Sequence, residues 1–490
     1  MDMDDQHART IFDGIQPLDG FHEFEKDLWG AFVWAAGSFS VRRPRDLRFA
    51  ALHLCYYGHE EKLFIRSEDC AQVEITLYNG WNTYAVDLSG LAGEEIRFEL
   101  ARVPPVEGDN RDLGVMIRWM RSMADRDTYE LVRDTLHNKV LNDAEYIERQ
   151  TELTSFPPQL RLSLVSACNI VPRCVYCDWE PTRNVEISSD FRFSADSLLD
   201  FGDFYRRASM VMDCSIGEPL LSKDFGSMAA EIHRSFKYLE FTTNGLLLGP
   251  ERRNDLLGKR AIVCVSLDSA TAEGYARYRN REFDTLLENL QALCRDKKEH
   301  NDLPHVLPTF IAMKSNLDEA PAFLRLMKEV GVDGVKLRSL NLYERLRANV
   351  VFRHGFRFDY EAEALSLDHV REVTATVHRT AADIGLPLIP EMEEFGTAED
   401  QSGGPPCSLP WKSMYVLNGG LNACCYMRIP PLARWSERRG RPYETFLRDV
   451  WNGPAYRNIR SALADGILPR QCLDTKACPI VRKQAGKEWG

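Results

Sequence analysis

Short runs rich in β-branched residues alternate with helical stretches from residue 159 onward, and this alternation restricts the fold more than any other feature of the chain. The six predicted strands lie at residues 160–165, 209–214, 238–243, 261–267, 306–313 and 335–337. The helical stretches between them include residues 194–208, with Ser194 as a candidate N-cap, and residues 317–330. Strands that alternate with helices form parallel βα units. Because six strands are fewer than the eight of a closed barrel, we expect a partial (βα)6 TIM barrel over residues 159–394, with functional residues at the strand ends.

The first 125 residues follow a different pattern, in which apolar and polar residues alternate over short runs. Residues 72–78 alternate in this way and end at Asn79-Gly80, a frequent hairpin turn, and residues 96–100 and 113–119 predict further strands. Several short strands with close turns predict an antiparallel β-sandwich over residues 1–125. Its aromatic residues, expected mostly in the core or on a sheet face and otherwise as ligand-stacking rings, include Trp29, Trp34, Tyr56, Tyr57, Trp81 and Tyr84. Residues 126–158 are predicted to form a helical linker, because apolar residues recur there at spacings of three and four.

Charge and hydropathy exclude several classes of partner. The 490-residue chain has a formal net charge of −12, which disfavours a nucleic-acid partner. No apolar run reaches the about 18–20 residues of a membrane span. Residues 1–5 lack the basic and apolar regions of a signal peptide. We therefore expect a cytoplasmic protein with no membrane span and no bound nucleic acid.

Thirteen cysteines are many for a chain expected in a reducing compartment, where disulfides do not persist. Cys168, Cys174 and Cys177 lie in one loop directly after the first predicted barrel strand. Three thiolates in one loop can ligate three irons of an iron–sulfur cluster and leave the fourth iron for a substrate or cofactor. Zinc is the alternative. It needs a fourth ligand that no nearby Cys or His supplies, although a C-terminal cysteine could complete the site in space.

Polar motifs follow the next three predicted strands. Because the carboxyl ends of parallel strands meet at one edge of a sheet, these motifs are expected near the cysteine loop. The residues concerned are Gly217, Glu218, Pro219, Asn244, Ser266 and Asp268. Each motif alone is weak, since Asn-Gly and Gly-Glu-Pro are common turns, but their order after a cysteine loop is specific.

In this order the motifs resemble those of radical S-adenosylmethionine (SAM) enzymes, over residues 159–345. The resemblance implies a [4Fe–4S] cluster on Cys168, Cys174 and Cys177 whose fourth iron binds SAM. It also implies a set of SAM-binding residues: Tyr176 beside the adenine, Gly217, Glu218 and Pro219 near the amino group, and Ser266 and Asp268 on the ribose side, to which we add Asn244. Two features depart from the family pattern. Two extra residues separate the first two cysteines, and Ile216 replaces the first glycine of Gly-Gly-Glu-Pro.

A second group of cysteines lies after residue 395. The spacing from Cys407 through Gly419 to Cys424 resembles the opening of the SPASM/twitch extension, which binds auxiliary clusters. The full SPASM ending is absent, and four ligands suit one cluster. The resemblance therefore implies a SPASM/twitch-like Fe–S domain over residues 395–490 with one auxiliary [4Fe–4S] cluster, whose ligands would be Cys407, Cys424, Cys472 and Cys478. A structural zinc knuckle is the alternative.

The substrate is suggested by the N-terminal segment. Residues 108–115 and the strands before them resemble a β-sandwich module of bacterial glycan-tailoring enzymes, and SPASM/twitch relatives include sugar epimerases of oligosaccharide antibiotic pathways. The leading hypothesis is a radical SAM enzyme whose 5′-deoxyadenosyl radical abstracts a carbinol hydrogen from a sugar or other glycosylated small molecule and epimerises that carbon. Cys214 and Cys425 are the candidate thiol hydrogen donors, and the alternative for each is a small buried hydrophobic residue.

Three other functions remain open. If an auxiliary cluster accepts an electron, the same abstraction yields a ketone and the enzyme is a sugar dehydrogenase. A peptide-maturing SPASM enzyme is a weaker alternative. Resemblance to that group would imply an N-terminal winged-helix peptide-recognition element, which a β-sandwich does not resemble. A non-enzymatic glycan-binding module on a zinc-stabilised scaffold is the third. Either enzymatic function needs an electron donor such as flavodoxin or ferredoxin.

Overall fold

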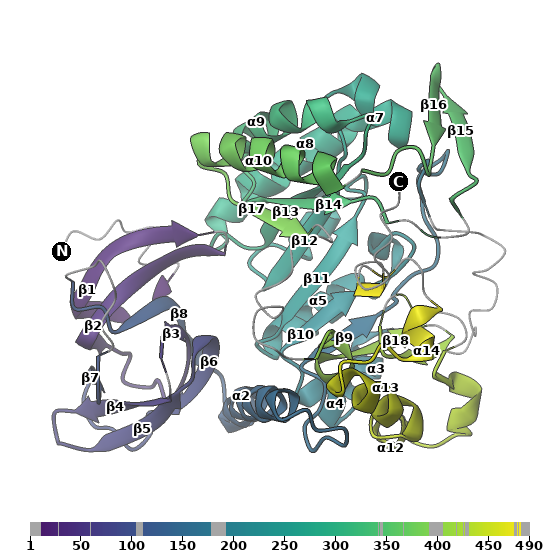
Figure 1. The fold of residues 1–490 in the computed structure, drawn as a ribbon. Coiled ribbons are helices and arrows are strands. Elements are labelled where there is room, and N and C mark those ends of the chain that lie inside the picture. Colours follow the sequence, from purple (N-terminus) through teal and green to yellow (C-terminus); the bar gives the residue numbers. More distant parts are fainter. Residues whose placement is uncertain are drawn as a thin grey trace. The chain divides into compact units, whose positions relative to one another are not determined.

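A computed structural model describes most of the chain. The described residues are 11–27, 29–58, 60–103, 111–177, 193–341, 343, 346–365, 367–391, 405–417, 419–424, 426, 431–474, 478 and 480–481. They fall into two compact units, Met1–Val140 and Leu141–Gly490 (Figure 1). None of the helices in the described ranges is long and apolar enough to cross a membrane.

The first unit is a single curled antiparallel sheet. Its eight strands are β1 (Gln16–Asp27), β2 (Gly30–Arg42), β3 (Phe49–Tyr56), β4 (Glu61–Ser67), β5 (Gln72–Leu77), β6 (Gly80–Asp87), β7 (Glu95–Leu100) and β8 (Val115–Met123). They pair in the order β5-β4-β7-β2-β8-β3-β6, with β1 on β2. The prediction of antiparallel strands is confirmed. The two separate layers of a sandwich are replaced by one continuous sheet, which curls until its end strands β5 and β6 adjoin: the Tyr78 amide donates to the Tyr84 hydroxyl at 2.9 Å.

The interior of this curled sheet is filled by side chains. The rings of Phe39 and Phe98 stack with centroids 4.7 Å apart. Beside Phe98 a cavity of about 10 Å³ remains, which is room for no more than one water molecule. Of the predicted aromatic residues, Tyr56 and Tyr84 are buried in this core, whereas Tyr57 is 54% exposed. A ligand of this unit would therefore bind outside the sheet.

A long helix and a ten-stranded sheet follow. Most of the segment predicted as a helical linker forms the helix α2 (Arg126–Ile147). The strands of the second sheet are β9 (Gln159–Leu162), β10 (Met210–Asp213), β11 (Tyr238–Thr243), β12 (Ala261–Ser266), β13 (His305–Ala312), β14 (Val335–Ser339), β17 (Leu388–Glu391), β18 (Ser413–Leu417), β19 (Gly420–Asn422) and β20 (Ala433–Arg434). The strands β9 to β14 are the six predicted ones, and they lie side by side in chain order, all parallel.

Two further parallel strands flank the predicted six. The strand β17 pairs with β14 at one end, and β18 pairs with β9 at the other. The strands β19 and β20 continue the sheet antiparallel beyond β18. The strands form an open path from β17 to β20, so the sheet does not close through backbone pairing within the described ranges. The C-terminal segment thus extends the same sheet as the predicted barrel.

Helices cover one face of this sheet. They are α5 (Phe225–Arg234), α6 (Pro250–Asn254), α7 (Ala272–Tyr278), α8 (Phe283–Asp296), α9 (Ala320–Val330) and α10 (Leu367–Asp383). Figure 1 shows α8, α9 and α10 along one side of β13, β14 and β17. Alternate strand residues such as Leu160, Val211 and Phe241 are buried in the core that includes these helices. Because successive strand residues point to opposite faces, the residues between them, such as Glu240, line the other face.

The first helical prediction of the barrel is only partly right. Residues 194–208 form two short helices, α3 (Ala195–Leu199) and α4 (Asp203–Arg206), rather than one. Ser194 caps α3 as predicted, with its side chain accepting from the Ser197 amide. The break occurs at Gly202, which has φ +55°, and a Cβ there would lie 2.0 Å from Glu444. Close packing against the helix α12 (Tyr443–Trp451) therefore overrides local helix propensity.

The remaining elements are short. An antiparallel hairpin of β15 (Val350–Arg353) and β16 (Phe356–Asp359) is inserted between β14 and α10. The C-terminal helices are α11 (Leu409–Lys412), α12, α13 (Pro454–Ala464) and α14 (Arg470–Leu473). Their apolar residues, including Trp411 and Trp451, join the core of the second unit.

Candidate active site

The cysteine loop after β9 is bound to the carboxyl end of β11. Asn244 directly follows β11, and its Nδ2 atom donates to Asn169 Oδ1 at 2.7 Å. The same Nδ2 lies 4.0 Å from the Cys168 sulfur, within the range of a hydrogen bond to sulfur. The first predicted cluster ligand and the predicted SAM-binding Asn244 therefore lie together.

The loop after β10 approaches the cysteine loop closely at Gly217. A Cβ on Gly217 would lie 2.2 Å from the Ala167 carbonyl oxygen, so only glycine fits here. The next residue, Glu218, donates its amide to that carbonyl at 2.8 Å. Pro219 then begins the short 3-10 helix Pro219–Leu221. Gly217, Glu218 and Pro219 are thus held against the residue that precedes Cys168.

The carboxylate of Glu218 joins the ends of β10 and β11. It accepts hydrogen bonds from the Thr243 hydroxyl and the Asn244 amide, both at 2.7 Å, and from the Leu220 amide at 3.2 Å. The side chain is buried, and desolvation raises its pKa to about 7 against these hydrogen bonds. Because its oxygens are occupied by protein donors, Glu218 fixes the shape of this edge.

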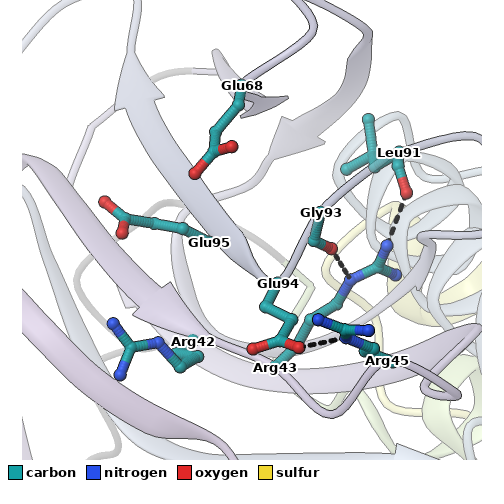
Figure 2. A pocket seen from close by; sticks show the side chains of 8 residues that line it. All are labelled: Arg42, Arg43, Arg45, Glu68, Leu91, Gly93, Glu94 and Glu95. Atoms are coloured by element: carbon teal, nitrogen blue, oxygen red, sulfur yellow. Dashed lines mark hydrogen bonds and ion pairs between the residues drawn. The ribbon is translucent and has the colours of Figure 1, made fainter.

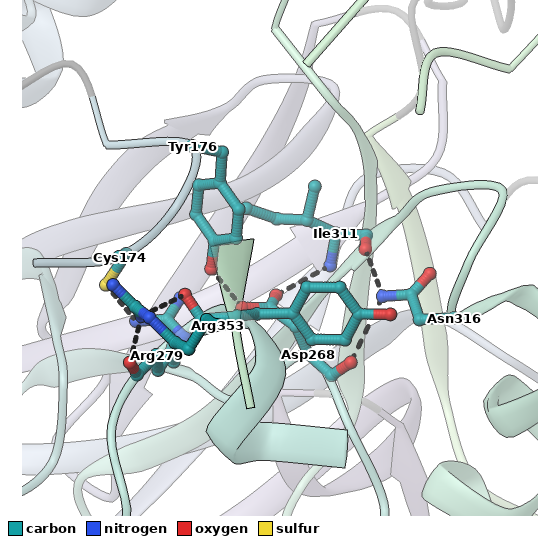
Figure 3. A network of polar contacts seen from close by, with 8 residues as sticks. Cys174, Tyr176, Asp268, Arg279, Ile311, Asn316 and Arg353 are labelled. Carbon is teal, nitrogen blue, oxygen red and sulfur yellow. Dashed lines mark hydrogen bonds and ion pairs between the residues drawn. The ribbon is translucent and has the colours of Figure 1, made fainter. Parts of the chain in front are cut away.

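Asp268 is the centre of a buried polar network that reaches the cysteine loop (Figure 3). Its carboxylate accepts from Arg279 Nε at 2.7 Å, from the Ile311 amide at 3.0 Å and from the Tyr176 hydroxyl. Arg279 in turn donates to the Cys174 sulfur at 3.7 Å. Asp268 and Tyr176 are therefore brought together as predicted residues of one site, but both Asp268 oxygens are bound to protein donors. Asp268 therefore orients the side chains of Tyr176 and Arg279.

A second arginine fixes the backbone around this network. Arg353, at the end of β15, donates to the carbonyl oxygens of Arg173 at 2.6 Å, Tyr278 at 3.4 Å and Arg279. The hairpin also joins an apolar cluster with Val175. The hairpin thereby links the cysteine loop to the end of α7. Sequence reasoning missed Arg279 and Arg353, because a single arginine without a motif gives no signal.

The donors around the cysteine loop suit a thiolate-bound cluster. Among the residues described, no three His, Cys, Asp or Glu side chains converge to hold a single metal ion. A [4Fe–4S] cluster takes one thiolate per iron, and hydrogen bonds to the sulfurs tune it. Asn244 and Arg279 supply such donors to Cys168 and Cys174, and the Cys177 amide donates to the Cys174 carbonyl at 3.1 Å. Without a metal, desolvation raises the pKa of Cys174 to about 11, opposed by the charge of Arg279.

The C-terminal cysteines lie in and around the last strands and helices of the second unit. The partly buried side chains that pack against its core include Cys407, Cys424, Cys472 and Cys478. Desolvation, and then the charge of Cys478, raises the pKa of Cys472 to about 12. Asn422 is fully buried two residues before Cys424, and its Nδ2 has no acceptor within the described ranges. Such a donor suits an acceptor that the described residues do not supply.

The two candidate hydrogen donors differ in what the structure describes. Cys214 directly follows β10, and its amide donates to the Leu162 carbonyl at 2.7 Å. By strand alternation it shares a face with Met212, opposite the helices. Ser266 ends β12 and lies on the same open face as Cys214. Cys425 lies outside the described residues.

The open face of the sheet is polar around Glu240. Its carboxylate forms an ion pair with Lys336 of β14 at 2.7 Å, and Cys264 of β12 lies 3.9 Å from the same oxygen. Thr242, the next residue of β11 on this face, is exposed. Around Glu240 the face therefore offers charged and hydroxyl groups.

A separate hollow lies at the rim of the first unit (Figure 2). It has a volume of about 720 Å³ and is lined by equal numbers of arginine and glutamate side chains, with Leu91 and Gly93. Arg43, the most buried of them, donates to the carbonyls of Leu47 at 2.7 Å, Leu88 at 2.9 Å and Gly93 at 3.3 Å. Arg45 pairs with Glu94. These contacts hold the loops of the rim together. Because arginines and glutamates are equal in number, the charges of the lining favour neither an anionic nor a cationic ligand.

Comparisons with known proteins give distant similarities. No family model matches the chain. Over 185 residues it is 25% identical to the tungsten-containing aldehyde ferredoxin oxidoreductase cofactor-modifying protein of Pyrococcus furiosus, covering 37% of this chain and 51% of that protein. The chain thus spans about half the length of this curated relative.

Solved structures are similar at low scores. SuiB of Streptococcus suis gives a TM-score of 0.48 at 15% identity, over 70% of this chain and 75% of SuiB. SuiB bound to S-adenosylmethionine gives 0.46 at 14%, over 74% and 78%. The protein anSMEcpe with bound AdoMet and a peptide gives 0.44 at 15%, over 67% and 95%. At these scores the similarities carry no argument about fold or function.

Proposed function

We propose that the chain is a radical SAM enzyme. The observation that carries this proposal is the convergence of three strand ends on one cysteine loop. Asn244 after β11 reaches Cys168, the segment with Gly217 after β10 contacts Ala167, and Asp268 after β12 reaches Cys174 through Arg279. Contacts that are so specific to one loop support a cluster and a cofactor at this edge.

The residues around the loop would hold the cluster and SAM. Cys168, Cys174 and Cys177 would ligate the cluster, and Gly217 lets its own loop pack against Ala167, next to Cys168. Tyr176, oriented by Asp268, presents its ring for the adenine. When bound, the reduced cluster supplies the electron that cleaves SAM to methionine and a 5′-deoxyadenosyl radical. The electron comes from a donor such as flavodoxin or ferredoxin.

The proposed substrate is a sugar or glycosylated small molecule, and the proposed outcome is epimerisation. The hydroxyl and charged groups on the open face, among them Thr242 and the Glu240–Lys336 pair, support a polyhydroxylated substrate. Loss of a carbinol hydrogen atom leaves a carbon radical. Cys214, on the same face, returns a hydrogen atom from its thiol, and the resulting thiyl radical takes one electron from the donor and one proton from water. Cys425 is the second candidate for this role.

Dehydrogenation is the second candidate function, because the C-terminal cysteines offer an electron acceptor. In that case the carbon radical loses one electron to an auxiliary cluster on Cys407, Cys424, Cys472 and Cys478 and one proton to a base, which gives a ketone. The buried unpaired donor of Asn422 beside Cys424 supports a group at this position. Peptide maturation would instead appear as turnover of peptides without turnover of oligosaccharides.

The first test is anaerobic reconstitution with iron and sulfide, followed by reduction and addition of SAM. We expect bound iron and 5′-deoxyadenosine. Cys174→Ala should abolish the 5′-deoxyadenosine, whereas Cys70→Ala, which removes an exposed cysteine of the first unit, should leave it unchanged. Bound zinc without 5′-deoxyadenosine would refute the proposal and favour a zinc-stabilised binding module.

The second test is turnover of oligosaccharides in deuterated buffer. An epimerase with a thiol donor places one solvent deuterium on the inverted carbon, because the thiol exchanges with water. Cys214→Ser should stop epimerisation while 5′-deoxyadenosine still forms. An inverted product without deuterium contradicts a thiol donor, a ketone product indicates the dehydrogenase, and reaction only with peptides excludes a sugar substrate.

A further inference from the structure

Arg279 is a buried cation in contact with a proposed cluster ligand, and the proposed reaction assigns it no role. It is 5% exposed and directly follows α7. Its Nη1 donates to the Cys174 sulfur at 3.7 Å and its Nε to Asp268 at 2.7 Å. The guanidinium carbon also lies 5.6 Å from the centre of the Tyr176 ring. Arg279 therefore touches both the cluster side and the adenine side of the proposed site.

The surrounding contacts fix this arginine in one place. Asp268, its ion-pair partner, is 1% exposed and is itself held by the Ile311 amide. The Arg279 carbonyl accepts from Arg353, which also binds the carbonyl of Arg173, next to Cys174. The guanidinium is thus held from both its side chain and its backbone. A planar group with several donors can bind a carboxylate and a thiolate at once, which a lysine ammonium does less well.

The contact with sulfur is more than an ion pair needs. Arg279 would be satisfied as a structural residue by Asp268 alone, yet a second arm of the guanidinium points at Cys174. Nη1 of the guanidinium lies 3.7 Å from the Cys174 sulfur while Nε binds Asp268, so the positive charge is in direct contact with the sulfur. An electron added to a thiolate-bound cluster is stabilised by such a charge, and hydrogen bonds to sulfur are known to tune cluster potentials.

We propose that Arg279 is a positioning residue that holds Cys174 and raises the reduction potential of the cluster, with Asp268 as its counter-ion and Arg353 as its backbone anchor. This inference rests on the proposed function, since it concerns the same cluster. Arg279 lies outside the cysteine motif, yet the reduction potential of the cluster, and so the first electron transfer to it, would depend on this residue.

The test is a redox titration of the reconstituted full-length protein, followed by electron paramagnetic resonance of the reduced cluster. Arg279→Gln removes the charge and leaves Asp268 unpaired beside the cluster, so the midpoint potential should become more negative. In the double variant Asp268→Asn/Arg279→Gln the unpaired carboxylate is also gone, and the potential should return part of the way to the wild-type value. Arg253→Gln, which breaks a similar arginine–carboxylate pair with Asp296 on α8, should leave the potential unchanged.

The outcomes separate an electrostatic role from a structural one. A merely structural Arg279 predicts loss of iron without any return in the double variant. If Arg279→Gln retains no iron, Arg279→Lys is compared with the double variant. A more positive midpoint for Arg279→Lys, which keeps the charge, supports the proposal, and equal midpoints overturn it. An unchanged midpoint in Arg279→Gln with intact iron also overturns it. If the wild-type protein has no reducible cluster, the proposed function itself fails.

Discussion

Glu240 and Lys336 form an ion pair at 2.7 Å although two strands, β12 and β13, lie between their own strands. Three strand spacings of about 4.8 Å would separate β11 from β14 by roughly 14 Å in a flat sheet. The two side chains meet because the sheet curves around its open face. The pair therefore reports the curvature that lets residues from several strand ends approach one site.

This pair gives a stability prediction. Both side chains are largely buried, at 19% and 7% exposure. Lys336→Met should lower the free energy of unfolding by about 3 kcal/mol, because it leaves a carboxylate unpaired in a poorly solvated place. The double variant Glu240→Met/Lys336→Met should recover most of that loss. Urea unfolding of the four proteins measures this, and additive losses would contradict direct coupling of the two charges.

Glu218 predicts a pH dependence of stability. Burial raises its pKa from the ordinary 4.5 to about 7, and the pKa of the neighbouring Asp213 from 3.8 to about 6. Between these values the folded state holds protons that the unfolded state has released. Unfolding free energy should therefore fall as pH rises from about 4 to 7 and level off above that. In Glu218→Gln the part of this fall between pH 6 and 7 should disappear, and a denaturation series across pH would show it.

Arg353 predicts the behaviour of the cysteine loop. Arg353→Ala removes hydrogen bonds to the carbonyls of Arg173, Tyr278 and Arg279, so the loop loses its link to α7. We expect faster hydrogen exchange at residues 168–177 and faster loss of iron to a chelator. Arg357→Ala is the matched control. It lies on the same hairpin, pairs only with Asp359 among the contacts described, and is 55% exposed. Equal exchange in both variants would show that the hairpin does not hold the loop.

The exposed ring of Tyr57 allows a test of glycan recognition by the first unit. It lies 6.4 Å from the ring of Trp34, centroid to centroid, and the packed interior of the sheet leaves no room for a sugar. Tyr57→Ala should weaken binding of an oligosaccharide substrate about tenfold through loss of stacking. Tyr57→Phe, which keeps the ring, should bind nearly as well as wild type. Calorimetric titration of the full-length protein measures both, and unchanged affinity in Tyr57→Ala would remove this face from consideration.

The strands were predictable where their signal is local. The β-branched runs that became β9 to β14 are buried on the helix side, and burial selects such residues wherever the strand lies. The strand β17 (Leu388–Glu391) is only four residues long and contains a proline. The strand β18 (Ser413–Leu417) is an apolar run, but its pairing with β9, far away in the chain, cannot be read from local sequence. The curled first sheet has the same alternation as a sandwich, so pattern alone could not separate them.

The candidate site was predictable only where a motif defines it. The cysteine loop and the residues after β10 to β12 follow from spacing and order. The roles of individual side chains could not be predicted. The carboxylate oxygens of Glu218 and Asp268 accept hydrogen bonds from protein donors that come close only when the chain folds. Arg279 and Arg353 come from segments without a motif and reach Cys174 and its neighbours through tertiary packing.

The pairing of β18 with β9 has a consequence for how the chain is made. Ser413 and Gln159 lie opposite each other across these strands although 254 positions separate them. Contacts of such long range form late and slow folding. Until the ribosome has released residues beyond 417, β9 keeps one unpaired edge, and an unpaired edge recruits other chains. Synthesis therefore passes through a stage in which the strand that carries the cysteine loop has an edge open to aggregation.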